Sequence, residues 1–251
     1  MMLLNNRVAL VTGASRGIGR AIALAMAKQG AAVTVNASQS AKAAELVAEE
    51  IRQEGGQASV GIADVSDPEA VLRMVADTRA RLGPIDILVN NAAIDHAVSF
   101  EEITPEEWDR VLAVNLKGVF NCCQAVIGEM KEQRYGKIVC ISSIAGLRGS
   151  LFGNVHYAAS KAGMHGFVMT LARQVAPYGI NVNAIAPGPI ETEMFRENVH
   201  GERRQRVLSG VPLGVMGQPE DIAHAAVFLA SDWARFITGA VLRANGGSLM
   251  G

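Results

Sequence analysis

Short apolar runs alternate with longer segments of helical periodicity along the whole sequence. The first apolar run, 8–11, is followed by a glycine-containing turn and a helical pattern over 18–28, and this order recurs to the end of the chain. Strands that alternate with helices of this length are joined by right-handed crossovers, which place the strands in one parallel sheet. The pattern predicts an α/β fold, a doubly wound parallel sheet with helices on both faces.

The same patterns predict the individual elements. We expect strands at 8–11, 32–36, 57–62, 85–89, 137–141, 180–185 and 241–243. We expect helices at 18–28, 41–54, 68–82, 105–130, 157–176 and 219–231, the fourth with an interruption near Asn115. Residues 187–217 form the least regular stretch, and a long irregular insertion in a compact α/β domain is usually a lid or binding loop. Without a linker or low-complexity tract, we expect 1–251 to be a single domain with a substrate lid at about 187–217.

The composition excludes several classes of protein. Hydrophobic residues make up 49% of the chain and charged residues 19%, which is too apolar for a disordered protein. The net charge of −1 indicates no basic surface for nucleic acid or an anionic membrane, and no apolar stretch approaches the ~20 residues that cross a bilayer. The three cysteines and five histidines show no metal-ligand spacing. We therefore expect a cytoplasmic protein without a nucleic-acid partner, a membrane or a metal.

A glycine-rich turn, Thr12-Gly13-Ala14-Ser15-Arg16-Gly17-Ile18-Gly19, joins the first expected strand to the first helix. Its spacing is G-x3-G-x-G, which differs from the commoner G-x-G-x-x-G of dinucleotide-binding folds. Glycines let the backbone turn tightly and approach a pyrophosphate, while the helix N-terminus offers free N–H groups and a partial positive charge. We expect this turn to bind a dinucleotide, and a turn with only a structural role is the alternative.

The end of the second expected strand indicates which dinucleotide is bound. An Asp or Glu there holds the ribose 2′-hydroxyl of NAD, whereas a 2′-phosphate requires that carboxylate to be absent and a cation to be nearby. The position holds Asn36, followed by Ala37 and Ser38, and no acidic residue precedes Glu45. Arg16 lies inside the glycine-rich turn, where its guanidinium can bind a phosphate in a forked geometry. These residues predict NADP(H); the alternative for Arg16 is a cap on a solvated edge.

Tyr157 and Lys161 form a Y-x3-K pattern, which places both side chains on one face of a helix, one turn apart. A nearby ammonium stabilises the phenolate and lowers the pKa of a tyrosine from its usual value of about 10, which makes the phenol usable as an acid or base. Ser142-Ser143 and Asn90-Asn91 each follow an expected strand, at the carboxyl ends of the strands where open α/β folds bind ligands. A hydroxyl there can polarise a carbonyl that Tyr157 protonates. An ordinary surface Tyr/Lys pair is the alternative.

Together these motifs resemble the short-chain dehydrogenase/reductase family, single-domain Rossmann-fold enzymes, over essentially the full length of the chain. The matching segments are Thr12 to Gly19, Asp64-Val65, Asn90-Asn91-Ala92, Asn115, Ser143, Tyr157 with Lys161, and Pro187-Gly188 through Thr192. Each motif is weak alone, whereas the whole set in order at fitting intervals is specific.

The resemblance implies a role for each catalytic residue. It makes Tyr157 the general acid for carbonyl reduction and Ser143 the residue that orients the substrate oxygen. Lys161 is implied to hold the nicotinamide ribose and to lower the pKa of Tyr157, and Asn115 to position a water in the proton relay. The hydride comes from the cofactor, so the protein supplies orientation and proton transfer.

The expected cofactor contacts come from the glycine-rich turn and from the same resemblance. The resemblance implies that Asp64 and Val65 contact adenine, that Asn91 contacts the adenosine ribose, and that Ile190 with Thr192 contacts the nicotinamide end. The complete expected set is Gly13, Ser15, Arg16, Gly17, Ile18, Gly19, Asn36, Ser38, Asp64, Val65, Asn91, Ala92, Tyr157, Lys161, Pro187, Gly188, Ile190 and Thr192.

Within the family, the chain is most similar to the 3-oxoacyl-[acyl-carrier-protein] reductases. The segments that carry this likeness are 35–40, 107–112, 186–192, 236–239 and 245–247. The likeness implies NADPH-dependent reduction of a 3-oxoacyl thioester, an acyl carrier protein as partner, and a homotetramer. A short-chain alcohol or sugar dehydrogenase, or a broad ketoreductase acting on small substrates, is the alternative. A catalytically silent NADP-binding protein is a further alternative.

Three features depart from that branch. Ala93 stands where the motif Asn-Asn-Ala-Gly has glycine. The residues from Ile94 to Ala97 differ from the Gly-Ile-Thr-Arg-Asp typical of the branch, and they place Asp95 on the expected binding rim, where a role in substrate choice competes with an ordinary surface position. Carrier-protein docking in the branch is attributed to two basic positions flanking the site; Arg134 matches one and Tyr178 replaces the other.

Overall fold

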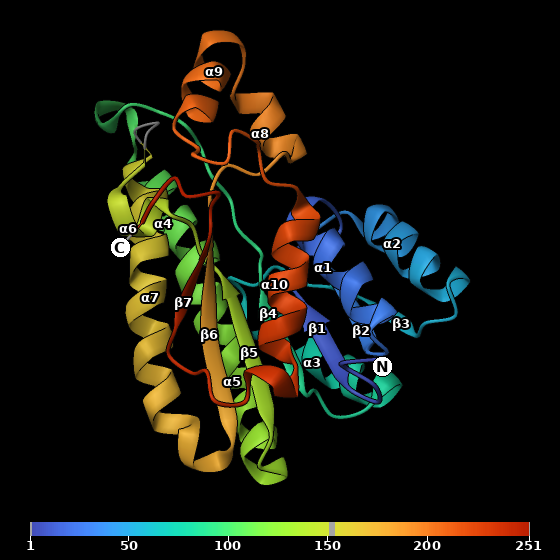
Figure 1. Cartoon of the computed structure of the whole chain (residues 1–251). Coiled ribbons are helices and arrows are strands. Elements are labelled where there is room, and N and C mark those ends of the chain that lie inside the picture. Colours follow the sequence, from blue (N-terminus) through green and yellow to red (C-terminus); the bar gives the residue numbers. More distant parts are fainter. Residues whose placement is uncertain (1, 151–153, 251) are drawn as a thin grey trace.

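Seven parallel strands form one sheet in the order β3-β2-β1-β4-β5-β6-β7 (Figure 1). The structure, a computed structural model, describes residues 2–150 and 154–250, so residues 1, 151–153 and 251 of the expected domain lie outside the described part. The strands are β1 (Val8–Val11), β2 (Ala32–Ala37), β3 (Ala58–Ile62), β4 (Ile87–Asn90), β5 (Gly136–Ile141), β6 (Ile180–Pro187) and β7 (Val241–Ala244). The doubly wound parallel sheet predicted from the sequence is confirmed.

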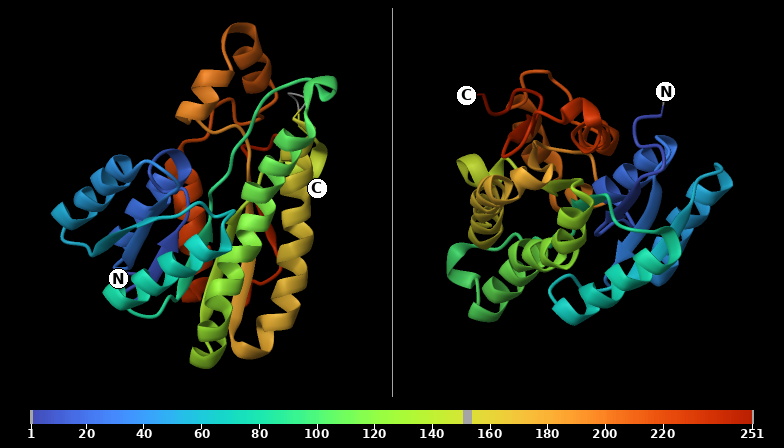
Figure 2. Two further views of the ribbon diagram at one scale, coloured as in Figure 1. Left: turned by 180° about the vertical axis from the view of Figure 1, so that it is seen from behind. Right: turned by 90° about the horizontal axis from the view of Figure 1, so that it is seen from below.

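Helices cover both faces of this sheet. One face carries α1 (Gly17–Lys28), α2 (Ala41–Gln53) and α10 (Pro219–Ala230), and the other carries α3 (Pro68–Leu82), α5 (Gly118–Gln133) and α7 (Val155–Val175). The view from behind shows α3, α5 and α7 in front of the strands (Figure 2). Each layer buries its own apolar cluster against the sheet, as expected where parallel strands are covered on both faces.

The segment 187–217 differs from its expected irregular structure. It contains two helices, α8 (Glu193–Asn198) and α9 (Gly201–Ser209), which lie above the carboxyl ends of the strands (Figure 1). Val207 and Val211 are buried at the base of α9, whereas the charged residues of this helix are mostly exposed. Few apolar residues pack these two helices against the rest of the fold, so their sequence shows no clear helical period of hydrophobic residues. A further short helix, α6 (Ala145–Arg148), was likewise not expected.

The expected interruption of the long helix is a π-helical turn, Ala113–Lys117, between α4 (Pro105–Leu112) and α5. Such turns are rare and frequently lie at functional sites. Among the described residues, the run Pro105–Gln133 is also the one that is long and apolar enough to cross a membrane, by length and composition alone. Half of its apolar window is buried inside the fold, and a core helix passes the same test.

The order of the strands reverses at the centre of the sheet. β1 pairs with β2 on one side and with β4 on the other. The helix that follows β1 therefore lies on one face, and the helices that follow β4 lie on the opposite face. Connections that diverge in this way leave a crevice at the carboxyl ends of the strands, where open α/β sheets bind ligands.

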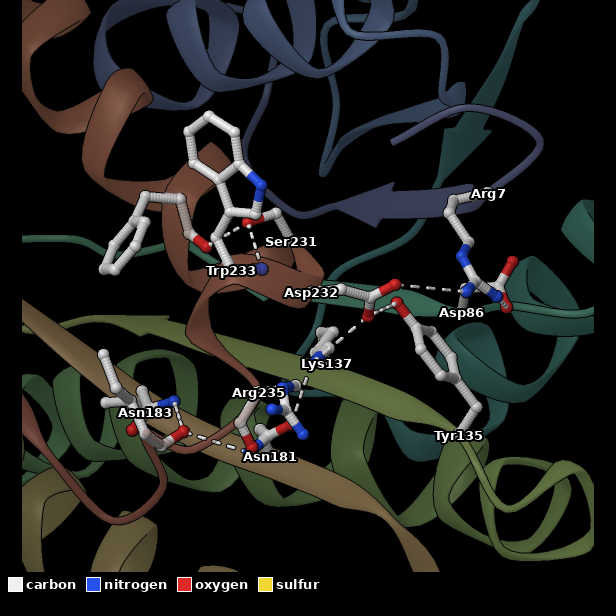
Figure 3. A network of polar contacts seen from close by, with 12 residues as sticks. Arg7, Asp86, Tyr135, Lys137, Asn181, Asn183, Ser231, Asp232, Trp233 and Arg235 are labelled. Atoms are coloured by element: carbon white, nitrogen blue, oxygen red, sulfur yellow. Dashed lines mark hydrogen bonds and ion pairs between the residues drawn. The ribbon is translucent and has the colours of Figure 1, made fainter. Parts of the chain in front are cut away.

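A polar network closes the end of the sheet opposite to that crevice (Figure 3). The Arg7 guanidinium lies 3.7 Å from the centroid of the Tyr135 ring and donates to Asp86 Oδ1 at 3.2 Å. The Tyr135 hydroxyl donates to Asp232 Oδ1 at 3.3 Å. Lys137 Nζ, almost fully buried at the start of β5, lies 3.8 Å from the same carboxylate, and burial lowers the pKa of this lysine. The network ties β1, β5 and the loop after α10 together, away from the crevice.

Candidate active site

A cavity of about 520 Å³ opens at the carboxyl ends of the strands, between the sheet and the pair α8–α9. Every residue of the expected cofactor set lines this cavity, and so does Ser143 beside Tyr157 and Lys161. The structure therefore brings together residues from the whole length of the chain that the sequence motifs singled out. Asn115 lies behind the wall of the cavity and does not line it.

The glycine-rich turn has the shape that a nucleotide cradle requires. Gly13 and Gly17 have φ values of +60° and +55°, which residues with a Cβ rarely adopt. A Cβ on Gly19 would lie less than 3.0 Å from the Gly13 carbonyl oxygen and from Asn91 Nδ2. The first turn of α1 carries no acidic residue, and Arg16 at its N-cap makes no side-chain capping bond. The helix N-terminus is thus open to an anion, and these residues fit a dinucleotide.

Hydrogen bonds join this turn to the end of β4. The Thr12 hydroxyl accepts from the backbone N–H groups of Asn91 and Ala92, at 2.9 and 3.1 Å. The side-chain amide of Asn91 donates to the carbonyl oxygens of Thr12 and Gly13, both at 3.0 Å. Asn91 therefore holds the turn as well as lining the cavity. Thr12 is missing from the expected site, although a polar residue that closes a buried strand is a signal for it.

Asn36, at the carboxyl end of β2, turns its side chain inward. Its Oδ1 accepts from the Gly13 N–H at 3.1 Å, and its Nδ2 donates to the carbonyl oxygens of Gly61 and Ala63 at 3.0 Å each. The side-chain amide of Asn36 is therefore hydrogen-bonded to the backbone of the turn and of the adjacent strand end. Asn36 thus lines the cavity and fixes its wall, and the feature that bears on the nucleotide is the absence of a carboxylate there.

Two arginines lie beside the glycine-rich turn. Arg16 is exposed on the rim of the cavity. Arg110, from α4, also lines the cavity and pairs with Asp64 at 2.7 Å. Burial alone would raise the pKa of Asp64, but hydrogen bonds from Ser66 and the Arg110 charge hold it below its usual value. Arg110 was not expected in the site, because it reaches the cavity only through its tertiary contacts with Asp64 and Ser66, which follow β3.

Tyr157 points into the cavity from the first turns of α7, near Ser143. Loss of solvent raises the pKa of Tyr157, the Asp95 carboxylate raises it further, and the Ser143 hydroxyl lowers it. Lys161 Nζ lies 5.6 Å from the centroid of the Tyr157 ring. The expectation that Lys161 leaves the tyrosine with a lowered pKa is therefore wrong for this structure, because burial and Asp95 dominate.

Lys161 lies one turn further along α7 and is 2% exposed. Its Nζ donates to the carbonyl oxygen of Ile141 at 2.8 Å. Burial lowers the pKa of Lys161 to about 8, and the nearby Cys140 and Asp95 offset part of that effect. The ammonium form therefore dominates at neutral pH and is lost in mildly alkaline solution.

Asn115 is fully buried in the π-helical turn. Its Oδ1 accepts from the Ile94 N–H and its Nδ2 donates to the Ile94 carbonyl oxygen, both at 2.9 Å. The same Nδ2 donates to Ser160 Oγ at 3.2 Å, directly before Lys161. Asn115 thus braces the segment that follows β4 against α7, from behind the cavity wall.

Comparisons with known proteins agree with this geometry. A family model described as "Enoyl-(Acyl carrier protein) reductase" matches residues 13–248. The 3-oxoacyl-[acyl-carrier-protein] reductase FabG of Staphylococcus aureus is 43% identical over 242 residues, which cover 96% of this chain and 98% of that relative. The chain belongs to the short-chain dehydrogenase/reductase family.

Two further relatives support the same family. An acetoacetyl-CoA reductase of Shinella zoogloeoides is 44% identical over 246 residues, covering 96% of this chain and 98% of the relative. The crystal structure of a 3-oxoacyl-[acyl-carrier protein] reductase from Brucella melitensis ATCC 23457 matches with a TM-score of 0.94 and 38% identity, over 99% of this chain and 93% of that one. As a short-chain dehydrogenase/reductase, the chain is an oxidoreductase that uses a nicotinamide cofactor on carbonyl or hydroxyl groups.

The backbone explains how this short-chain dehydrogenase/reductase accommodates one departure from the 3-oxoacyl-[acyl-carrier-protein] reductases. In the described ranges, the residues other than glycine with positive φ are Asn6 and Arg134. Ala93 is not among them, so an alanine fits there without strain. In the same ranges, no group of three or more His, Cys, Asp and Glu side chains could hold a metal ion.

The expectation that Arg134 flanks the site is wrong within a single chain. Arg134 precedes β5, whereas Ser143 follows it, and a six-residue strand spans roughly 20 Å. The Arg134 guanidinium donates to the carbonyl oxygen of Pro177 at 2.8 Å, and Lys131 Nζ lies 5.0 Å from the ring of the adjacent Tyr178. This patch of Lys131, Arg134 and Tyr178 lies at the far end of the sheet from the cavity.

Proposed function

We propose that the protein catalyses NADPH-dependent reduction of a ketone carbonyl to a secondary alcohol, with a 3-oxoacyl thioester as the substrate class. The observation that carries the proposal is the meeting of Ser143, Tyr157 and Lys161 in the cavity that the glycine-rich turn closes at its other end. The two ends of that cavity suit the two parts of a hydride transfer, nucleotide binding and protonation of the product oxygen.

The proton donor is the Tyr157 phenol. Burial keeps its pKa high and hence keeps the phenol protonated, and a general acid must hold its proton until the substrate oxygen becomes basic. The bound dinucleotide supplies the hydride. Ser143 donates to the substrate oxygen and orients it, and Lys161 is proposed to hold the nicotinamide ribose. Asn115 holds the segment from Ile94 onward, which keeps the cavity wall in place.

The cofactor preference follows from charge at the rim. No carboxylate at the end of β2 competes with a 2′-phosphate, because Asn36 stands there with its amide turned inward. Arg16 and Ser38 are exposed beside this position. A guanidinium and a hydroxyl suit a phosphate, which supports NADPH over NADH.

The substrate class is supported by the named activities of the relatives, which act on a 3-oxoacyl carrier-protein thioester and on acetoacetyl-CoA. A small ketone or sugar is the second candidate, and the Asp95 carboxylate in the cavity wall favours it. The segment 187–217 is proposed to act as the substrate lid, since α8 and α9 stand over the cavity.

The assembly and location are proposed from the same relationship. We place the enzyme in the cytoplasm as a homotetramer. In such an assembly, an acyl carrier protein can contact both Arg134 and a cavity only if these belong to different subunits, because the length of β5 separates them within one chain.

The test is oxidation of NADPH with an acetoacetyl thioester and with a panel of small ketones and sugars, for the wild type and for Tyr157→Phe. We expect thioester turnover above that of the panel, and a loss of about 100-fold or more in the variant, because general acids contribute about that much. The NADPH dissociation constant of the variant should change by less than about threefold. Tyr135→Phe, which alters a tyrosine of the distant polar network, is the matched control and should keep full activity. Undiminished turnover by Tyr157→Phe would refute the mechanism, and turnover confined to small ketones or sugars would replace the thioester assignment.

A further inference from the structure

A second polar feature lies in the cavity wall beside the catalytic tyrosine. Asp95, in the segment that follows β4, and Asn154, at the N-cap of α7, both line the cavity. Asn154 Nδ2 donates to Asp95 Oδ1 at 2.6 Å. An N-cap asparagine usually satisfies its own helix, but Asn154 makes no side-chain capping bond. It is directed to Asp95 instead.

Asp95 and Asn154 have acceptor atoms that receive no hydrogen bond from the described part of the chain. Asn154 is 2% exposed, and its Oδ1 is buried without a hydrogen-bond partner. Among the described residues, Asn154 is also the one side chain that donates to Asp95. A carboxylate has room for about four hydrogen bonds. An unpaired buried acceptor such as Asn154 Oδ1 is costly, which points to a missing donor, whereas Asp95 is half-buried and open to the cavity.

The neighbouring histidines do not supply that donor. His96 Nδ1 lies 3.1 Å from Glu107 Oε1, and His156 Nε2 lies 3.6 Å from the same oxygen. Neither ring nitrogen of the buried His156 has a hydrogen-bond partner, so this ring does not donate to Asp95. Burial raises the pKa of Asp95, and its hydrogen bond from Asn154 and the positive charges of His156, His96 and Lys161 act against that rise.

We propose that Asp95 and Asn154 form an acceptor site that binds an O–H or N–H donor of the substrate next to Tyr157 and thereby determines which ketones are reduced. The inference rests on the proposed ketone reduction. A purely apolar chain in this place would strip water from Asp95 without replacing it. A donor-bearing chain satisfies the pair, and sites built around such a bond strongly reject analogues that lack it.

Two substrate classes carry the donor. A hydroxy ketone offers a hydroxyl on the carbon next to its carbonyl, and an acyl thioester of a pantetheine arm offers an amide N–H.

The experiment uses two matched pairs of ketones. The first pair is 1-hydroxy-2-butanone and 2-butanone, which differ in one hydroxyl. The second pair is the N-acetylcysteamine thioester and the ethyl thioester of acetoacetate, which differ in the amide group. We measure kcat/KM with NADPH for the wild type, for Asp95→Leu and for the isosteric Asp95→Asn, which covers the case that the leucine variant does not fold. Glu101→Gln, which removes an exposed acid of the same segment outside the cavity, is the control.

The wild type should prefer the donor-bearing member of at least one pair by about tenfold or more, since hydrogen bonds to charged groups contribute about 10- to 100-fold. In Asp95→Leu that preference should fall below about threefold through slower turnover of the donor-bearing member alone, and Asp95→Asn should lie between the two. The pair that loses its preference identifies the source of the donor. An equal loss on both members, or an unchanged preference, would overturn the acceptor site while the ketone reduction stands. No turnover of any of the four ketones by the wild type would contradict the proposed function, and this inference with it.

Discussion

Tyr157 is half-buried at the cavity wall and Lys161 is buried beside it, and loss of solvent shifts the pKa values of the two side chains in opposite directions. It raises the pKa of the phenol and lowers that of the ammonium to about 8. Burial thus favours the neutral form of each group, as it must where water is excluded. The tyrosine gains by this, because a proton donor has to be protonated, whereas the lysine stays charged at neutral pH at a cost to stability.

That cost gives a prediction for the pH dependence of stability. The pKa of Lys161 is about 8 in the folded protein against its usual value of 10.5, so between these values the unfolded chain binds more protons than the folded one. The free energy of unfolding therefore rises with pH across this window. For the enzyme without cofactor, we expect a gain of about 2 kcal/mol from pH 7.5 to 9.5 in the wild type relative to Lys161→Met. Urea denaturation at the two pH values measures it, and parallel pH profiles for the two proteins would contradict the assignment.

A second prediction at the residue scale concerns Arg16. If its guanidinium binds the 2′-phosphate, Arg16→Ala should weaken NADPH binding by about 10- to 100-fold and change NADH binding by less than about threefold. Arg20→Ala is the matched control, since Arg20 lies one turn further along α1 and pairs with Glu50 at 2.5 Å. Titration of each variant with both nucleotides separates the cases. Equal losses for the two nucleotides would remove Arg16 from the selection.

At the scale of elements, α1 approaches β4 so closely that its third residue must be glycine. We expect Gly19→Ala to abolish measurable nucleotide binding and to lower the melting temperature, because the added Cβ would strike the Gly13 carbonyl oxygen and Asn91 Nδ2. Gly128→Ala in α5 is the control: nothing lies within 4 Å of its added Cβ, and a helical glycine-to-alanine change should stabilise by roughly 0.5–1 kcal/mol. Calorimetry with nucleotide titration tests both, and normal binding by Gly19→Ala would show that the turn can relax.

The elements also show what the sequence alone could predict. Features that the backbone itself demands were predictable: the turn at Gly13 and Gly17, and the break near Asn115, which is a π-helical turn. The short helices α6 and α8 were not, because segments of four and six residues are too short to show a helical period.

At the scale of the whole molecule, the errors share one cause, contacts between segments distant in sequence. The inward turn of the Asn36 amide depends on the carbonyl oxygens of Gly61 and Ala63, and the raised pKa of Tyr157 depends on burial and on Asp95. Arg110 enters the cavity through the packing of α4. The position of Arg134 at the far end of β5 follows from strand direction, which a short sequence motif does not contain. Local patterns therefore predicted the set of site residues, and the roles of several members needed the tertiary structure.

The hydrogen bonds between Thr12 and Asn91 join residues 79 positions apart. A chain growing from its N-terminus contains the complete glycine-rich turn early, but the partner that fixes the turn is synthesised only with β4. The nucleotide pocket can therefore mature only after Asn91 has been synthesised and the central strand pair has formed, at the cost of a long loop closure. A dinucleotide that binds only the mature pocket stabilises the native state over the unfolded state by its binding free energy. Cofactor supply and folding yield are therefore coupled in this protein.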